Sequence, residues 1–215
     1  MKRVYFVRHG ETTGNLAKQF QTFETELAEA GHEGAKKVAD RFKHVELDAL
    51  VASPMKRAQQ TAEYIGEAVG QSVETFYDFH EQLQAEDVRG KAHDDPYVLA
   101  HLTADDYYEH FAKDEVVAPG FENYAAVLKR MQACADFLRS HKASNIAVVS
   151  HAAYLRSLAA FFLLQENPGK DINILLNRSL KNMNNAAVTE FMYDSEYNED
   201  GWMLYTWNDQ SHFAE

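Results

Sequence analysis

Short runs of β-branched and aromatic residues alternate with segments of helical spacing along most of this chain. Strands are expected over residues 3–7, 47–53, 72–79, 145–151, 185–194 and 201–209. Helices are expected between them, over residues 30–45, 53–70, 123–141 and 152–165. This alternation is typical of an α/β fold with helices on both faces of a mostly parallel sheet. We predict a three-layer α/β/α sandwich whose last two strands form a hairpin and supply an antiparallel edge strand.

One acidic segment interrupts this alternation. Residues 86–115 contain nine acidic and three basic residues among several aromatic ones, and Pro119-Gly120 marks the end of the segment. We interpret it as a helical insertion, about 86–120, in a single domain that spans residues 1–215. The insertion is expected to lie over the active-site rim as a lid, with a merely solvated helical face as the alternative.

Charge and cysteine content limit the partners and the compartment. The formal net charge of −12 disfavours nucleic acid and anionic membranes as partners. Cys134 is the single cysteine, so no disulfide can form within the chain, and its helical spacing indicates a buried spectator. The first apolar run is too short for a signal peptide, and no run of 18 apolar residues occurs. The sequence therefore predicts a cytoplasmic protein.

Reactive side chains follow three of the predicted parallel strands. Arg8 and His9 follow the first strand, Arg57 lies in the helix after the second, and His151 follows the fourth. Because ligands bind beyond the carboxyl ends of such strands, these four side chains should converge. Two arginines beside helix N-termini suit the oxygens of a phosphate group. Ser53 is expected to cap the helix that contains Arg57, which Gly70 should end.

This constellation favours nucleophilic catalysis on a phosphate ester. The arginines would keep His9 neutral, so its imidazole could attack phosphorus and form a phosphohistidine while His151 stabilises charge. Glu81 is the candidate acid, with Glu86 and Asp87 as competitors. No spacing of metal ligands is evident and arginines repel cations, so we expect no metal and no cofactor. The other eight histidines, His93, His101 and His110 among them, are interpreted as surface residues. Taken alone, Arg8-His9 would be interpreted as a solvated turn, Ser53-Pro54 as a helix cap and His151 as a satisfied histidine at a strand end. Their joint placement at strand ends argues against these interpretations.

Six segments of the chain resemble the histidine phosphatase superfamily, which includes cofactor-dependent phosphoglycerate mutase. The segments follow the order of the family's motifs, and they are RHGETTGN (8–15), FETELAEAG (23–31), SPMKRAQQTAEYI (53–65), FHEQL (79–83), VVSHAAYLRSL (148–158) and WNDQSHF (207–213). Ala152 stands where the family usually has Gly, and Ala85 replaces another usual Gly after the acid.

The resemblance implies roles for individual residues. His9 would be the phosphorylated nucleophile and Glu81 the proton donor. The phosphate pocket would comprise Arg8, Arg57 and His151, and Asn15 and the backbone at Ala152 would also contact the phosphoryl group. The family needs no metal.

Three functions remain open at this stage. Mutases of the family hold the substrate carboxylate with basic residues after the acid, whereas this segment has only Arg89, Lys91 and Lys113. We therefore favour a phosphomonoester hydrolase acting on a small phosphorylated substrate. A 2,3-bisphosphoglycerate-dependent phosphoglycerate mutase is the first alternative, and a non-catalytic phosphate-binding protein is the second. A homodimer is left open.

Overall fold

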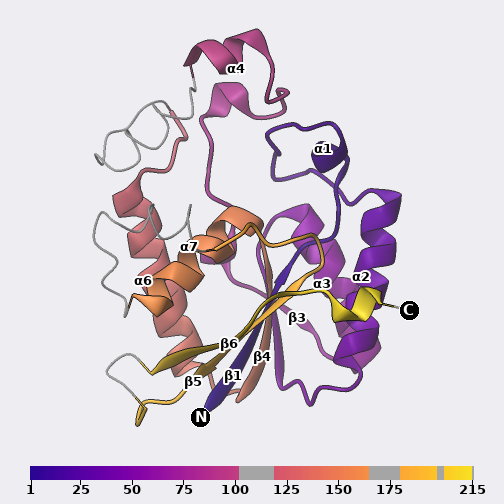
Figure 1. Cartoon of the computed structure of the whole chain (residues 1–215), viewed down its shortest axis with the longest axis vertical. Coiled ribbons are helices and arrows are strands. Elements are labelled where there is room, and N and C mark those ends of the chain that lie inside the picture. Colours follow the sequence, from indigo (N-terminus) through magenta and orange to yellow (C-terminus); the bar gives the residue numbers. More distant parts are fainter. Residues whose placement is uncertain (102–118, 165–179, 198–200, 215) are drawn as a thin grey trace.

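The chain folds around one six-stranded sheet with helices on both of its faces (Figure 1). The computed structural model describes residues 1–101, 119–164, 180–197 and 201–214. The strands are β1 (Lys2–Arg8), β2 (Ala49–Ala52), β3 (Val73–Thr75), β4 (Asn145–Ser150), β5 (Val188–Tyr193) and β6 (Trp202–Asp209). The helices are α1 (Thr13–Leu16), α2 (Glu29–Phe42), α3 (Lys56–Val69), α4 (Pro96–His101), α6 (Tyr124–Ser140) and α7 (Ala152–Leu163), with short 3₁₀ turns η1 (Tyr77–Phe79), η2 (Glu86–Val88) and η3 (Ser211–Phe213).

The sheet has the strand order β3-β2-β4-β1-β5-β6. Neighbours among β3, β2, β4 and β1 are parallel, whereas β5 pairs antiparallel with both β1 and β6. The predicted three-layer sandwich with a mostly parallel sheet and an antiparallel pair at one edge is therefore confirmed.

Two hydrophobic cores lie on the opposite faces of the sheet. Helices α6 and α7 pack on one face, where Phe162 stacks on Trp202 with ring centroids 4.0 Å apart. Helices α2 and α3 pack on the other, where residues such as Phe42 and Ile65 are buried. Cys134 lies in the first core, and burial raises the pKa of its thiol to about 12. The expectation of a buried, unactivated thiol is thus confirmed.

Two local predictions are wrong. The third strand ends at Thr75 instead of residue 79, because the chain turns inward there through η1 and buries Phe79. Helix α3 begins at Lys56 after an N-cap at Met55, so Ser53 is not its cap. The predicted end of that helix is confirmed, since Gly70 adopts a left-handed conformation with φ of 71°.

The start of the insertion lies above the carboxyl ends of the parallel strands (Figure 1). Its main chain is tied to the segment after α1: Phe20 donates to the carbonyl of Lys91 (3.0 Å), Gly90 to that of Phe20 (2.6 Å) and His93 to that of Lys18 (2.9 Å). Helix α4 confirms a helix in the described part of the insertion, while residues 102–118 lie outside the described residues. Among the helices of the described residues, none combines the length and the apolar composition that a membrane span requires.

Candidate active site

The reactive residues meet where the direction of the chain changes between two neighbouring strands. Strands β1 and β4 are adjacent and parallel. The chain leaving β1 goes on to α2 on one face, whereas the chain leaving β4 enters α7 on the other. A crevice opens at such a switch point. His9 follows β1 and lines this crevice, and His151 follows β4 and lies fully buried beside His9, with ring centroids 5.1 Å apart.

Main-chain contacts fix the orientation of the His9 ring. Its Nδ1 lies 2.6 Å from the carbonyl oxygen of Gly10. Because a carbonyl only accepts hydrogen bonds, Nδ1 carries the proton and Nε2 keeps its lone pair. Burial, assisted by the charges of Arg57 and Arg8, holds the pKa of His9 well below its usual range. His9 is therefore a neutral imidazole with a defined nucleophilic atom.

Arg57 is buried against that nucleophilic atom. Its Nε donates to Nε2 of His9 across 3.3 Å, and its Nη1 donates to the carbonyl of Thr22 across 2.8 Å. Burial, together with the like charge of Arg8, lowers the pKa of Arg57 to about 10. The guanidinium is thus still charged at neutral pH. Arg8 is anchored in turn by the carbonyl of Met183, which its Nη1 contacts at 2.5 Å.

His151 lies fully buried beside His9. Its Nε2 is hydrogen-bonded to Oγ of Ser53 across 2.7 Å, and the same oxygen accepts a bond from the N–H of Met55 (3.3 Å). Burial, and next the charge of Arg57, hold the pKa of His151 well below its usual range. Ser53 thus orients the second imidazole of the site.

Two asparagines complete the rim, and one of them was missed from the sequence. The Nδ2 group of Asn185 donates to the carbonyls of His9 (3.1 Å) and Gly10 (3.0 Å) and to Oδ1 of Asn15 (3.3 Å). Oδ1 of Asn15 also accepts from the N–H and hydroxyl of Thr12. The oxygen of the Asn15 amide is therefore occupied, and its NH₂ group is the part left to meet an anion.

Glu81 lies on the same rim, bound to the first turn of α7. Its carboxylate accepts from the N–H groups of Ala153 (3.3 Å), Tyr154 (2.8 Å) and Gln82 (2.9 Å). Of the three carboxylates considered from the sequence, Glu81 lines the central cavity, whereas Glu86 and Asp87 belong to η2 in the insertion. Ala152 is the first residue of α7, and its contact with a phosphoryl group remains a prediction.

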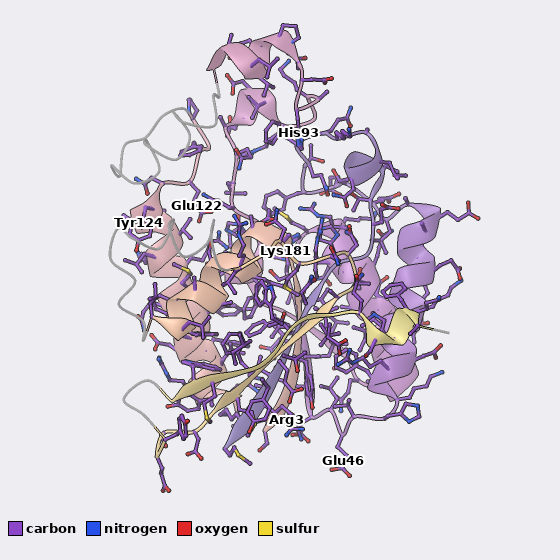
Figure 2. All side chains as sticks on the ribbon, viewed as in Figure 1. Arg3, Glu46, His93, Glu122, Tyr124 and Lys181 are labelled. Atoms are coloured by element: carbon purple, nitrogen blue, oxygen red, sulfur yellow. The ribbon has the colours of Figure 1, made fainter. Side chains whose placement is uncertain are left out.

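The cavity of about 360 Å³ extends from His9 toward the insertion. Its outer part is lined by Phe20, Phe23, Leu83, Arg89 and His93, and the rings of Phe20 and His93 lie 4.5 Å apart. Figure 2 labels His93 in the insertion, on the side that faces the segment after α1. The cavity thus has cationic side chains at its inner end, near His9, and partly apolar side chains at its outer end.

The histidine predictions are mixed. His93 is exposed, as expected, but His80 is 4 % exposed and so was wrongly placed at the surface. The side chain of His101 and all of His110 fall outside the described residues. Within the described part of the chain, no three His, Cys, Asp or Glu side chains are grouped to hold a metal ion.

The sequence matches a known family. The model of the histidine phosphatase superfamily (branch 1) matches residues 4–210. The chain belongs to this superfamily. Its members act as phosphatases or mutases, so the resemblance seen in the sequence motifs is confirmed.

Curated relatives of the chain have both kinds of name. An uncharacterized phosphatase, PhoE, of Bacillus subtilis is 26% identical over 216 residues, which cover 100% of this chain and 98% of that protein. A probable phosphoglycerate mutase, GpmB, of Erwinia tasmaniensis is 39% identical over 74 residues. That second match spans 34% of each chain, about a third of the relative's length.

Solved structures share the fold over the whole chain. A mycobacterial glucosyl-3-phosphoglycerate phosphatase with VO₃ has a TM-score of 0.76 at 24% identity, covering 98% of this chain and 100% of that one. A phosphoserine phosphatase mutant of Entamoeba histolytica with phosphoserine has a TM-score of 0.73 at 23% identity, covering 99% and 100%.

Proposed function

We propose that this member of the superfamily is a phosphomonoester hydrolase acting through a phosphohistidine at His9. The observation that carries the proposal is the pairing of a neutral His9, protonated at Nδ1, with the charged Arg57 at its Nε2. Such a site presents a lone pair and a cation to the same phosphoryl group. The arginines offset the charge of the phosphate dianion, which would otherwise repel a nucleophile.

The proposed reaction has two steps. Nε2 of His9 attacks phosphorus, the bond from phosphorus to the ester oxygen breaks, and Glu81 gives that oxygen a proton. Water then attacks the phosphohistidine and returns a proton to Glu81, which releases inorganic phosphate and restores His9. Arg8, Arg57, His151 and Asn15 would hold the phosphoryl oxygens throughout, together with the N–H group of Ala152, the first residue of α7.

The insertion favours hydrolysis over mutase chemistry. Arg89 lines the cavity, but its Nε donates to the carbonyl of Gln84 and its Nη2 to that of Gly120, both at 2.9 Å. Lys91 lies over the ring of Tyr97, with Nζ 5.4 Å from the centroid, and Lys113 is outside the described residues. The described part of the insertion therefore offers few basic residues to bind a substrate carboxylate, and Arg89 is bound to the main chain. Lys18, from outside the insertion, also lines the cavity.

A metal-free assay tests this proposal. We expect the purified protein, treated with chelator, to hydrolyse p-nitrophenyl phosphate and His9→Ala to lose that activity. An acid-labile phosphoryl adduct should form on the wild type and not on the variant. Interconversion of 3- and 2-phosphoglycerate, stimulated by 2,3-bisphosphoglycerate, would instead establish the mutase. If the protein shows neither activity but binds phosphate, it is a non-catalytic binding protein.

Four further expectations belong to the proposal. The substrate is a small phosphorylated molecule, because the cationic site lies inside a cavity of about 360 Å³. The net charge of −12 disfavours nucleic acid and anionic membranes as partners. A cytoplasmic location and a homodimer stay predictions.

A further inference from the structure

A buried arginine on α6 holds the segment that carries Glu81. Arg130 is 5 % exposed, and its Nη1 donates to the carbonyls of Asp78 (2.8 Å) and His80 (2.6 Å). Its Nε and Nη2 donate to the two carboxylate oxygens of Glu122, at 2.7 and 2.6 Å. All three nitrogens of the guanidinium are therefore used, two of them in a paired contact with one carboxylate.

Glu122 extends this contact to the other side of Glu81. Its Oε2 accepts from the N–H of Leu83 (3.2 Å), and its own N–H donates to the carbonyl of Leu83 (3.0 Å). Figure 2 shows Glu122 above the upper end of α6, on the side of the insertion. The ion pair therefore fixes the main chain immediately before Glu81 and again two residues after it.

The same guanidinium also reaches the helix that binds the Glu81 carboxylate. Its carbon Cζ lies 3.9 Å from the ring centroid of Tyr154, and the N–H of Tyr154 donates to Glu81. Arg130 thus contacts both the segment that carries the carboxylate and the helix turn that receives it. A buried ion pair is weak evidence for stability, because desolvation opposes its attraction. A positional role explains its placement better.

We infer that Arg130, paired with Glu122, is a positioning residue that keeps the carboxyl group of Glu81 at the leaving-group side of the cavity. The inference rests on the proposed function, since it presumes that Glu81 protonates the leaving oxygen. Arg130 contacts no reacting atom itself. Loosening it should therefore harm proton donation and leave the nucleophile and the phosphate pocket intact.

Leaving-group dependence separates this role from general support of the fold. The probes are 2,4-dinitrophenyl, 4-nitrophenyl and phenyl phosphate, compared through kcat/KM, which reports formation of the phosphohistidine. A dinitrophenolate leaves without a proton, whereas phenoxide needs one. For Arg130→Lys and Glu122→Gln, we expect a loss of about tenfold or more on phenyl phosphate and less than about twofold on the dinitrophenyl ester. Glu81→Gln should give the same pattern with a larger loss.

Leu138→Ala is the matched control, because Leu138 is fully buried on α6 about two turns beyond Arg130. Leu138→Ala should lower the melting temperature without changing the ratios of kcat/KM among the three esters. Equal losses on all three esters in Arg130→Lys and Glu122→Gln, or no loss at all, would overturn the inference. If Glu81→Gln is steeply leaving-group dependent and both other variants are not, only the positioning role fails. If Glu81→Gln also lacks the dependence, the acid assignment fails and the positioning role fails with it.

Discussion

Arg57 donates from Nε to Nε2 of His9 across 3.3 Å, so a buried cation touches the lone pair of a neutral imidazole. The cation could not approach a protonated ring in this way. A phosphoryl group would have to reach Nε2 through the same lone pair that accepts this hydrogen bond. We infer that an arriving phosphate replaces Nε2 of His9 as the acceptor, so that the guanidinium of Arg57 then donates to a phosphate oxygen.

Arg57→Lys should lower kcat/KM for p-nitrophenyl phosphate by about 10²- to 10³-fold. The planar guanidinium of Arg57 donates to His9 and Thr22 at the same time through two of its nitrogens. The single ammonium nitrogen of a lysine cannot reproduce this geometry. Lys56→Gln is the control next to it, because it removes only an exposed ion pair with Glu26 and should change the rate little. Similar rates in the two variants would show that the fork is not needed.

The buried imidazoles should make stability depend on pH. The pKa values of His9 and His151 are held well below the ordinary value, mainly by burial. Below about pH 6.5 these histidines bind protons in the unfolded protein and stay neutral in the folded protein. The free energy of unfolding therefore falls as pH falls. His9→Asn should reduce this slope between pH 6.5 and 5.5 by up to about 1.4 kcal/mol per pH unit.

The measurement is the free energy of unfolding in urea at each pH. His44→Asn, which replaces an exposed histidine, should keep the slope of the wild type. An unchanged slope in His9→Asn would mean that folded His9 titrates like an unfolded one.

The sequence predicted the parallel part of this site and missed its antiparallel part. His9, Arg57 and His151 follow parallel strands, whose carboxyl ends meet at one edge, so their convergence could be deduced. Asn185 precedes β5, and β5 runs the other way. The amino end of that strand reaches the same edge, and a search of carboxyl ends overlooks it.

The sequence also did not reveal residues whose side chains bind main-chain carbonyls. Arg130 lies on an amphipathic helix, and the sequence pattern of such a helix predicts that a lone arginine is exposed to solvent. Its role arises from the carbonyls of Asp78 and His80, and side-chain patterns say nothing of these. His80 is buried for a related reason, since the early end of β3 turns it inward.

Ser53→Ala should lower kcat by about tenfold on aryl phosphates while the protein stays folded. The hydroxyl holds Nε2 of His151 at 2.7 Å, and its loss would free the ring and leave a buried nitrogen without a bond. Because His151 is proposed to stabilise charge on the phosphoryl group, the loss should be the same for good and poor leaving groups. A loss confined to poor leaving groups would instead link Ser53 to the proton donor.

Two glycines on α2 should respond in opposite ways to the same substitution. A Cβ at Gly31 would lie 1.9 Å from the carbonyl oxygen of Glu11, in the loop that carries His9. Gly31→Ala must push this loop away, so we expect a loss of about 1–3 kcal/mol or more in unfolding free energy and a fall in kcat/KM.

At Gly34 the nearest atoms to such a Cβ, on Ala186 and Phe213, are 3.5 Å away, an ordinary contact. Alanine is the better helix former, so Gly34→Ala should add about 0.5–1 kcal/mol and leave activity unchanged. Urea unfolding and the aryl phosphate assay measure both variants. If alanine is tolerated equally well at Gly31 and Gly34, the close approach of α2 to the main chain of Glu11 does not hold the loop that carries His9 in place.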